Sequence, residues 1–569
     1  MIFMIDKLKL QIREDLEKSL SAKYNQPINV VVEEPKTSGL GDISIPVFSI
    51  VKTVRKQLNE VVEDVINALE YSSAFNLIKA VTRVGGFINI TLDRLGFSKA
   101  VIKENQSASF GQLDIGENKT IVIDYSSPNI AKPFSVGHLR STIIGHAIGN
   151  ILEKLGYNVV RINHLGDFGT QFGKIIYSYL NFGDKAKVDK NPIEELVKLY
   201  VEFHEIAKEK PEIEDKAREI FKELEQGNPE YQKLWSHFRE VSLSEYMKVY
   251  EMLNVRFDSY DGEAFYNDKM QAVVEELTEK SLLVKDEGAM IVDLGEDMPP
   301  ALIQKTDGST LYITRDLAAL FYRKKTYDFD EVLYVVGNEQ KLHFEQLKSV
   351  VKKMCYDFYE NIHHINFGLV LQDGKKMSTR KGKIVKLEDV LMEATNLSLE
   401  YINEKNPDLA NKAVIAQKIG VSAIIFNDLK NYRTNDVEFN LEDMVNFVGQ
   451  TGPYLQYTSV RISSVLEENS FNCENIDYHL FTSDHSFELI KTIAQYQEIL
   501  IKAKSEYSPS VLAKYLLSLA SYFNSFYAKE KIVVDDVLER NTKLCLISII
   551  RNILDEGMNL LGMQVIRKM

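Results

Sequence analysis

Apolar and polar positions in the first hundred residues follow the pattern of a small α+β domain. The spacing is helical over residues 6–20 and 53–71, and it is strand-like over residues 28–33 and 84–92. Glycine and serine gather over residues 107–118, which is typical of a linker. We therefore expect an N-terminal domain over residues 1–112.

A second unit has the pattern of a parallel sheet with covering helices. Residues 120–124 form a short β-branched run suited to a buried parallel strand, and residues 158–162 resemble it. The helix expected between them carries an apolar stripe and ends at Gly156, which is well placed as its C-cap. This βαβ unit predicts a doubly wound, Rossmann-type parallel sheet that resumes at residues 331–336 and 364–370.

The remaining patterns are mostly helical. Residues 185–282 are highly charged and would interrupt the sheet domain, which we place at 118–384. Gly452 and Pro453 break the later helical pattern and separate a helical region at 385–450 from a domain at 451–569. The expected fold class is α/β, with a small α+β domain before the sheet and an all-α domain after it.

Composition narrows the class of protein. The chain of 569 residues is 45% hydrophobic and 26% charged, and we find neither an apolar run of about 18 residues nor a signal peptide. Cys355, Cys473 and Cys545 are widely separated, which predicts no disulfide framework and no cysteine zinc site and fits a reducing cytoplasm. The net charge of −14 comes mostly from the middle of the chain, so the nearly neutral ends permit an RNA partner without indicating one.

The segment 126–138 lies between the first sheet strand and its helix. His138 would stand at the start of the helix, where free N–H groups and the helix dipole favour a phosphate. Gly137 lets a ligand approach the backbone, while Asn129 and Lys132 add a donor and a positive charge. The alternative is a proline-containing turn with an incidental histidine.

A compact basic loop, residues 373–382, follows the last predicted sheet strand. Four cations surround its Met-Ser-Thr sequence between two glycines: Lys375, Lys376, Arg380 and Lys381. The usual explanation of such a run is a solvated surface. Its position favours a mobile loop that closes over a pyrophosphate leaving group, because ligands bind at the carboxyl ends of the strands in such sheets.

Two further segments carry candidate binding residues. Three glycines within residues 163–173 suggest a backbone packed against a ligand such as adenine, although a strand-to-helix turn is the alternative. Helical spacing after residue 312 would put Tyr312 and Asp316 on one face, and Asp316 and Asp124 could then bind a guanidinium. From the residues alone, both aspartates are better explained as acids at a helix start and a strand end.

The four segments together resemble class I aminoacyl-tRNA synthetases, and specifically the arginyl-tRNA synthetase family, over nearly the whole chain. Residues 127–142 are similar to that family's version of the HIGH signature, and residues 376–382 are similar to its KMSKS loop. Residues 164–173, 311–316 and 452–457 also resemble segments of the family.

The resemblance implies ATP-dependent attachment of L-arginine to tRNA(Arg) through an arginyl-adenylate. It implies that the N-terminal domain contacts the tRNA elbow, that region 385–450 contacts the tRNA stem and that the last domain binds the anticodon. ATP would be used with Mg²⁺, with no tightly bound metal. The protein would be a cytoplasmic monomer that does not bind a membrane.

Residue roles follow from the same resemblance. The implied catalytic residues are His138, Lys132 and Lys376. The implied ATP contacts are Ser135, Gly137, His138, Gly166, Asp167, Gly169, Lys376, Met377, Ser378, Arg380 and Lys381. The implied arginine contacts are Asp124, Ser127, Asn129, His164, Tyr312, Asp316 and Gln340.

Three positions depart from the family pattern. Ser135 stands where the HIGH signature has its first histidine, and Thr379 stands where the general KMSKS loop has its second lysine. Phe168 replaces a tryptophan, which is a milder change. Because two usual donors or cations are missing, more of the phosphate contact should fall on His138 and Lys132.

Two other functions would use the same fold. A small-molecule adenylyltransferase would not need the two flanking domains. A non-catalytic RNA-binding relative would not need His138, Lys376 and the candidate pocket acids. A zinc-dependent enzyme of the cysteinyl type is disfavoured by the dispersed cysteines, and the charged insertion at 185–282 carries no motif that indicates its role.

Overall fold

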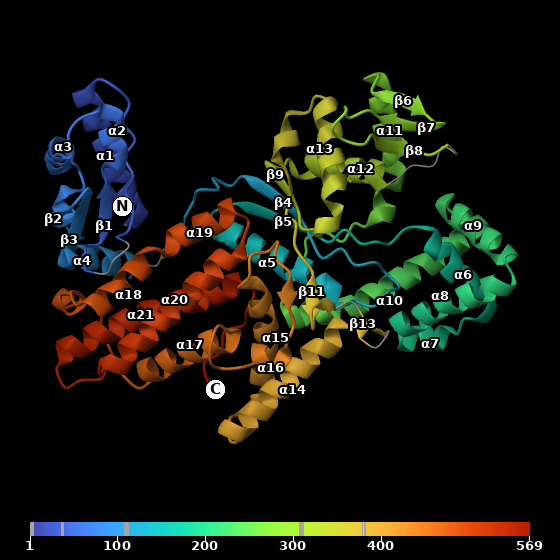
Figure 1. The fold of residues 1–569 in the computed structure, drawn as a ribbon. Helices are drawn as coiled ribbons and strands as arrows, with labels where there is room; N and C mark the ends of the chain where they lie inside the picture. The colour runs from blue at the N-terminus through green and yellow to red at the C-terminus, as the bar shows by residue number, and fades with distance from the viewer. Residues whose placement is uncertain (1–4, 36–38, 107–112, 307–311, 378, 381–382) are drawn as a thin grey trace.

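A sheet of four parallel strands, in the order β10-β9-β4-β5, lies at the centre of the molecule (Figure 1). The computed structural model describes residues 5–35, 39–106, 113–306, 312–377, 379–380 and 383–569. The sheet strands are β4 (Thr120–Asp124), β5 (Asn158–Ile162), β9 (Glu331–Tyr334) and β10 (Ile362–His364). Their connecting helices are η2 (Val136–His138), α5 (Leu139–Lys154), α12 (Tyr312–Tyr327), η4 (Asn338–Gln340), α13 (Lys341–Lys353) and η5 (Asp357–Asn361). The predicted Rossmann-type sheet is confirmed, and β4 and β5 have the predicted bounds.

The N-terminal domain is a three-stranded antiparallel sheet with four helices. Its elements are α1 (Ile5–Tyr24), β1 (Ile43–Pro46), α2 (Phe48–Val54), α3 (Leu58–Glu70), η1 (Phe75–Leu77), β2 (Ile78–Val84), β3 (Phe87–Leu92) and α4 (Arg94–Asn105). The strand predicted at residues 28–33 is wrong, because only Glu33 pairs, through one bridge to Ser44. The helix predicted over 53–71 is two helices, since Arg55 adopts the left-handed conformation that ends α2.

A largely helical insertion separates β5 from β9 and extends to the right in Figure 1. Its helices are α6 (Thr170–Phe182), α7 (Lys185–Lys190), α8 (Pro192–Glu209), α9 (Glu212–Glu225), α10 (Pro229–Leu253), η3 (Glu263–Lys269) and α11 (Met270–Glu279). A small antiparallel sheet that the hydrophobic pattern did not predict follows, with strands β6 (Leu283–Asp286), β7 (Ala289–Val292) and β8 (Ala301–Gln304).

The strand predicted over residues 364–370 is wrong, because the chain leaves the sheet there. β10 ends at His364, and β11 (Val370–Gln372) pairs instead with β12 (Lys375–Lys376) and β15 (Val437–Glu438). Gly368 allows the departure, since its N–H bonds the carbonyl of Arg433 at 3.0 Å and a Cβ would lie 2.6 Å from a neighbouring backbone oxygen. The hairpin β13 (Thr379–Arg380) and β14 (Lys383–Ile384) completes the basic loop.

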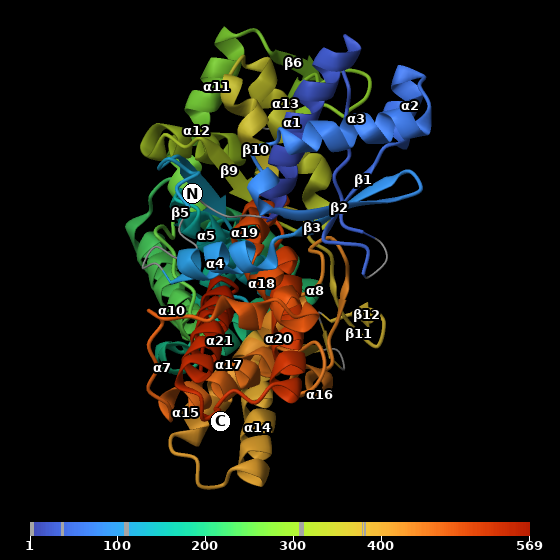
Figure 2. The ribbon, with the colours of Figure 1, turned by 90° about the vertical axis from the view of Figure 1, so that its left-hand side faces the viewer.

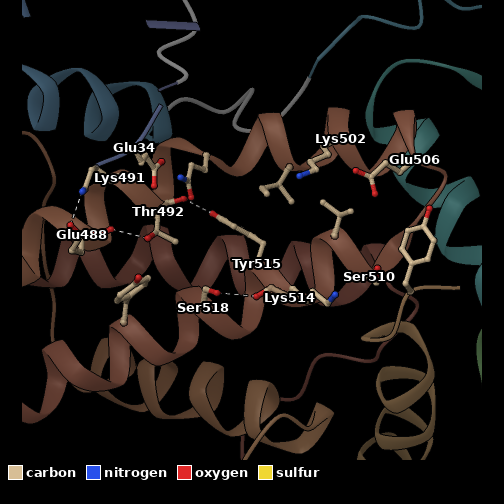
Figure 3. Close-up of a pocket in the computed structure, with 15 residues that line it drawn as sticks. Glu34, Glu488, Lys491, Thr492, Lys502, Glu506, Ser510, Lys514, Tyr515 and Ser518 are labelled. Carbon is tan, nitrogen blue, oxygen red and sulfur yellow. Dashed lines mark hydrogen bonds and ion pairs between the residues drawn. The ribbon is translucent and has the colours of Figure 1, made fainter. Parts of the chain in front are cut away.

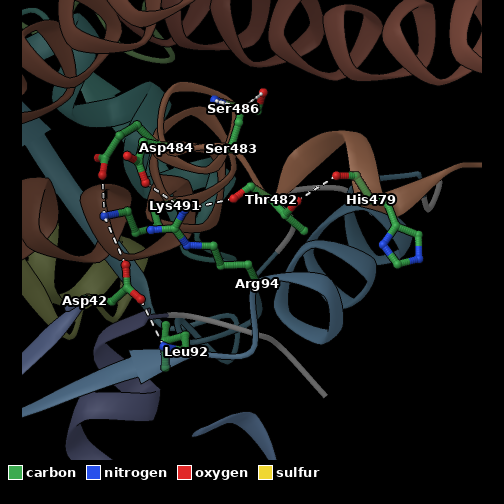
Figure 4. A network of polar contacts seen from close by, with 10 residues as sticks. Asp42, Leu92, Arg94, His479, Thr482, Ser483, Asp484, Ser486 and Lys491 are labelled. Carbon is green, nitrogen blue, oxygen red and sulfur yellow. Dashed lines mark hydrogen bonds and ion pairs between the residues drawn. The ribbon is translucent and has the colours of Figure 1, made fainter. Parts of the chain in front are cut away.

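The last 180 or so residues are almost all helical, as predicted, and the N-terminal domain rests on them (Figure 2). Their helices are α14 (Leu387–Lys405), α15 (Lys412–Leu429), α16 (Leu441–Met444), α17 (Gly452–Glu467), η6 (Tyr478–Phe481), α18 (Asp484–Ala494), α19 (Tyr496–Ser505), α20 (Pro509–Lys529) and α21 (Val537–Leu560). Figure 4 shows Arg94 of the N-terminal domain reaching the start of α18, where Nη1 donates 2.8 Å bonds to the carbonyl of Thr482 and to Asp484 Oδ1. The ring of Phe97 packs edge-on against Phe487 beside this contact.

Cys473 and Cys545 form a disulfide, which corrects the expectation drawn from cysteine spacing. The two residues are 72 positions apart, so their proximity depends on how the last domain packs and not on a local pattern. Gln106, just after α4, donates to Cys545 Sγ at 3.2 Å, which places the disulfide beside the N-terminal domain. Across the described residues, no helix is both long and apolar enough to cross a membrane.

Candidate active site

The loop after β4 holds a strained backbone at the carboxyl end of the sheet. Ser126, Ser127 and Ala131 all have positive φ angles, of 73°, 48° and 57°, although none is glycine. Such conformations persist only where surrounding contacts over-determine them, and they gather at functional sites. Here the amide of Ser126 bonds Ser141 Oγ of α5 at 2.9 Å, which fixes the loop on the helix.

The charged insertion supports this loop, a role that its sequence did not reveal. On α10, the Tyr246 hydroxyl donates to the carbonyls of Asn129 and Lys132 at 2.7 and 2.6 Å, and the Ser242 hydroxyl accepts from the amide of Ala131 at 3.1 Å. The hydroxyls of Tyr250 and Ser126 also lie 2.8 Å apart. α10 therefore holds the loop after β4, mainly through bonds to the backbone of the loop.

His138 is held as a neutral donor. The amide of Ser135 donates to His138 Nδ1 at 3.1 Å, so Nδ1 is the acceptor and the ring proton lies on Nε2. Burial, aided by the charge of Lys132, lowers the pKa of His138 to about 4. The ring also stacks on Phe134 with centroids 5.1 Å apart. The imidazole can thus donate one hydrogen bond from Nε2 without carrying a charge.

A cavity of about 240 Å³ lies beside His138, between the start of α5 and the basic loop. It brings together Gly137, His138, Lys376 and Met377, all of which were predicted ATP contacts. The lining residues that sequence reasoning missed are Ser126, Arg140, Ser141, Val335, Val336, Gly337, Glu339, Phe367, Gly368, Leu369 and Val370, together with Ser127, which was predicted for arginine. The apolar residues among them form one wall of the cavity. Several of them lie just after β9 or just before β11, and this position is the feature of the sequence that could have indicated them.

Backbone hydrogen bonds join the segment that carries His138 to the chain just after the basic loop. Ser135 pairs with Lys386 through an isolated bridge, and the amide of Val136 donates to the carbonyl of Val385 at 3.2 Å. The amide of Leu387 in turn donates to the carbonyl of Phe134 at 2.9 Å. The segment that follows the basic loop is therefore held by hydrogen bonds against the loop that carries His138.

Several predicted ATP contacts lie elsewhere. Lys132 is exposed and does not line the cavity, although its charge acts on His138. Ser135 does not line the cavity either, and it acts there through His138, whose ring it orients. Ser378 and Lys381 lie outside the described residues, and so does the side chain of Arg380.

The three-glycine segment has structural explanations. A Cβ on Gly166 would lie 2.2 Å from Asn129 Oδ1, so this glycine lets the exposed Asn129 loop pack closely. Gly169 has a φ of 134°, which favours glycine at the start of α6. Asp167 is buried and accepts from Arg239 Nε and the amide of Ala264, both at 2.9 Å. These residues shape the insertion and do not line the cavity beside His138, and the adenine interpretation of the segment stays a prediction.

Asp124 has a partner within the protein itself. Arg323 Nη2 of α12 lies 2.8 Å from Asp124 Oδ2, and both side chains are almost fully buried. Ser127 Oγ donates to the other carboxylate oxygen at 3.0 Å, and His164 Nδ1 lies 3.2 Å from Arg323 Nη2. Asp124, Ser127 and His164 thus gather around the guanidinium of Arg323, and their contact with arginine stays a prediction.

Asp316 remains available as an anion. Burial alone would raise its pKa, but the hydrogen bond from His343 Nε2 at 2.6 Å and the charges of His343, His164 and Arg323 hold the pKa below its usual range. Tyr312 begins α12 one turn earlier and is 69% exposed. Gln340 is exposed at the start of α13, three residues before His343. Tyr312 and Asp316 therefore both lie on a helix, four residues apart, as the sequence predicted.

Glu263 is a candidate site residue that carries no recognisable motif. It lies in η3, with Oε2 3.8 Å from Arg315 Nη1, and its side chain is mostly buried. Burial raises its pKa to about 7, with further upward effects from the charges of Asp316 and Asp167 against the lowering effect of Arg315. The charge of Asp316 acts on Glu263, so the two acids lie near one another. A buried carboxylate with a shifted pKa is a candidate site residue.

The described residues form no cluster of side chains that could bind a metal ion. No group of three or more histidine, cysteine, aspartate or glutamate side chains among them could hold one. Among the described residues that line the cavity beside His138, the only carboxylate is that of Glu339.

Comparisons with known proteins agree with this geometry. Family models match residues 98–441 as the catalytic domain of class I (R) tRNA synthetases, residues 455–569 as a DALR anticodon binding domain and residues 6–92 as an arginyl tRNA synthetase N-terminal domain. An arginine–tRNA ligase of Enterococcus faecalis is 46% identical, over 98% of this chain and all of the relative. One of Streptococcus suis is 47% identical, over 99% of this chain and all of the relative.

Solved structures agree at the level of the whole chain. An arginyl-tRNA synthetase of Plasmodium falciparum is 26% identical, covers 99% of both chains and has a TM-score of 0.83. The parallel sheet, the loop that carries His138 and the helical last domain are together the architecture of a class I aminoacyl-tRNA synthetase. The chain belongs to the arginyl-tRNA synthetase family.

Proposed function

We propose that the protein attaches L-arginine to its cognate tRNA in two steps, using ATP with Mg²⁺. The observation that carries the proposal is the cavity beside His138, which we call the nucleotide cavity: Ser126 and Ser127 after β4 line it together with Lys376 of the basic loop. Two buried acids that interact with each other, Glu263 and Asp316, are candidates for a cationic ligand. The cavity would then bind a ligand that carries phosphates, and the two acids would bind a ligand that carries a positive charge. Family membership supports arginine as the amino acid and tRNA as its acceptor.

In the first step, the carboxylate of arginine attacks the α-phosphate of ATP and pyrophosphate leaves. In the second, the terminal ribose hydroxyl of the tRNA takes the arginyl group and AMP leaves. No protein nucleophile is needed, so catalysis consists of positioning and charge stabilisation. His138 donates from Nε2 to a phosphate oxygen, and Lys376 supplies positive charge from the facing loop.

The rest of the cavity suits the nucleotide. The apolar wall that includes Phe367 and Val370 suits an adenine ring. Because Glu339 is the only carboxylate among the described lining residues, we infer that Mg²⁺ arrives bound to the phosphates of ATP. Lys132 remains a predicted catalytic residue, and it would have to move from its exposed position to touch a phosphate.

The arginine guanidinium would bind Asp316 and Glu263, with Tyr312 and Gln340 at the rim. Paired carboxylates suit the planar guanidinium, and a pocket built to bond its donors rejects analogues that lack them by roughly 10⁴. Asp124 would act on the arginine pocket indirectly, because it holds Arg323 in place. Asn129 is left for the amino and carboxylate end of the substrate.

The flanking domains support a large RNA substrate. The matched N-terminal and anticodon binding domains fit contacts at the tRNA elbow and anticodon, and region 385–450 fits contacts with the tRNA stem. We infer that the enzyme acts as a monomer in the cytoplasm, where tRNA is charged. The domain boundaries given above remain predictions.

ATP–pyrophosphate exchange tests the proposal. Exchange should require arginine, should fail with lysine or citrulline, and should depend on added tRNA, as the family resemblance implies. Exchange that proceeds with arginine but never charges tRNA would favour a small-molecule adenylyltransferase instead.

A further inference from the structure

Two adjacent cavities form a groove where the three parts of the protein meet. One, of about 530 Å³, lies between α18, α19 and α20 and reaches Glu34 of the N-terminal domain (Figure 3). The other, of about 380 Å³, lies between α13, β10 and the turn before α20. Tyr432 and Glu506 line the first, while their chain neighbours Arg433 and Tyr507 line the second. The two cavities are therefore adjacent, and we call them together the junction groove.

Four cations in the junction groove have no carboxylate within 4 Å among the described residues: Lys348, Arg433, Lys502 and Lys514. Lys348 Nζ donates only to the carbonyl of Glu360, at 3.2 Å. Figure 3 shows Lys502 on α19 and Lys514 on α20 beside the same hollow.

The carboxylates of the junction groove are mostly neutralised already. Glu34 pairs with Lys9 at 3.0 Å, Glu488 with Lys491 at 2.6 Å and Glu345 with Lys341 at 3.7 Å. Glu506 is the one lining carboxylate without such a partner in the described parts of the chain. Four unpaired cations against one unpaired acid leave the groove with an excess of positive charge.

Arg433 shows that the charge is built in. Its guanidinium is half-buried, with Nη1 bonded to the carbonyl and side-chain oxygens of Asn366 at 2.6 and 2.8 Å. Its Nε is buried and makes no hydrogen bond within the described residues. A cation removed from water without a counterion costs free energy, and an anionic ligand would recover it.

We infer that the junction groove binds the sugar–phosphate backbone of the tRNA, between its anticodon and its acceptor end. The inference rests on the proposed function. Helices α18–α20 belong to the matched anticodon binding domain, and β10 neighbours β9, whose end leads to Gly337 in the nucleotide cavity. An RNA held at both ends must cross the surface between them. Lysines at its phosphates would position it without reading its sequence.

The exposed aromatic residues of the groove suit the same ligand. Tyr432 and Tyr522 line the larger cavity, and the two residues are 36% and 43% exposed. Ribose and base faces of RNA pack on such rings. The groove thus offers both phosphate and stacking contacts along one path.

The test is the salt dependence of tRNA binding by the full-length enzyme. The variant Lys348→Ala/Lys502→Ala/Lys514→Ala should bind purified tRNA about 10- to 100-fold more weakly at low salt. Its slope of log affinity against log salt should be smaller by about 3, or about 1 for each lysine. The KM for tRNA should rise while kcat at saturating tRNA stays within about twofold. The control Lys353→Ala removes an exposed lysine of α13 outside the groove and should change neither quantity.

The outcomes separate this inference from the proposed function. If the wild type charges tRNA with arginine but the triple variant keeps the wild-type slope and affinity, the inference fails alone. If inorganic phosphate binds the wild type and not the triple variant while the tRNA slope is unchanged, the groove serves free anions, which also overturns it. Thermal unfolding of the variant should match the wild type, because the three lysines make no ion pairs in the described structure.

Discussion

Arg140 and Asp428 form a fully buried ion pair, with Arg140 Nε 2.9 Å from Asp428 Oδ2. Arg140 lies in the first turn of α5, two residues after His138, and Asp428 lies near the end of α15. The same guanidinium donates to the carbonyls of Asn435 and Arg433 at 2.8 and 3.1 Å, just before β15. β15 pairs with β11, whose other neighbour carries Lys376. One side chain therefore connects the helix behind His138 to the platform of the basic loop.

Removing one member of this pair should be costly. Asp428→Ala leaves the guanidinium buried without a counterion and should cost about 3–5 kcal/mol of stability, measured as a lower midpoint of thermal unfolding. The double variant Arg140→Met/Asp428→Leu should recover much of that loss, because it buries no charge. Equal midpoints for the single and double variants would show that the charge is not what matters.

The low pKa of His138 has consequences for stability and for catalysis as pH changes. Its pKa of about 4 lies below the unfolded value of 6.5, so between these values the unfolded state binds more protons and stability falls as pH falls. The loss should reach up to about 3 kcal/mol by pH 4, and His138→Gln should show a smaller fall in thermal midpoint between pH 7 and pH 4.5 than the wild type. An unchanged acid sensitivity in the variant would contradict the low pKa.

The same neutral state constrains catalysis. Because His138 is already uncharged at pH 5.5, the activation rate should show no ionisation of this residue between pH 5.5 and 8. His138→Ala should lower kcat for exchange by about 10²–10³, as removal of one preorganised donor does. The measurement is exchange across that pH range at saturating substrates, with the circular dichroism of the variant as the control for folding.

Glu263 should make arginine binding pH-dependent. Its pKa of about 7 means that it is half protonated near neutrality, and a guanidinium binds the ionised form. The KM for arginine should therefore rise as pH falls from 8 to 6, while the KM for ATP changes little. Glu263→Gln should have a higher KM for arginine at pH 8 and a flatter profile. A wild-type pH profile in the variant would remove Glu263 from the pocket.

Glu263 also carries a stability prediction of the opposite sign to that of His138. Its folded pKa is raised above the unfolded value of 4.5, so the contribution is present below pH 4.5 and is lost as pH rises towards 7. Glu263→Gln should then stabilise the protein above pH 7 by on the order of 1–3 kcal/mol. A variant that is more stable and poorer with arginine is the expected combination at a binding site.

Asp124 distinguishes a positioning role from direct substrate contact. If its main partner is Arg323, Asp124→Asn should lower the thermal midpoint and impair the use of both arginine and ATP, since a buried guanidinium loses its counterion. Asp316→Asn should mainly raise the KM for arginine. If Asp124→Asn raised only the KM for arginine at full stability, Asp124 would instead touch the substrate.

The sequence predicted the parts of the fold that depend on local pattern. The β-branched runs of β4 and β5, the stripe of α5 and the helical last third needed only neighbours in the chain. The site residues around Gly137, His138, Lys376 and Met377 were predictable from the residue types of two loops, segment 126–138 after β4 and the basic loop, although the basic loop follows β11 and not a strand of the parallel sheet.

What the sequence could not predict depends on pairs of distant residues. Arg323 follows Asp124 by almost two hundred residues, so nothing near Asp124 indicated that its carboxylate was already neutralised. Cys473 and Cys545 meet only after the last domain folds. Glu263 lies in a short 3₁₀ helix inside an insertion with no motif, and its raised pKa arises from burial and neighbours.

The central claim is that this enzyme joins arginine to tRNA. Its most direct test is charging of purified tRNA with radiolabelled arginine in the presence of ATP and Mg²⁺, with lysine and citrulline as the competing amino acids. The account predicts acid-precipitable arginyl-tRNA from arginine alone, with little product from His138→Ala or Lys376→Ala. Equal charging by lysine, or wild-type turnover in both variants, would contradict it.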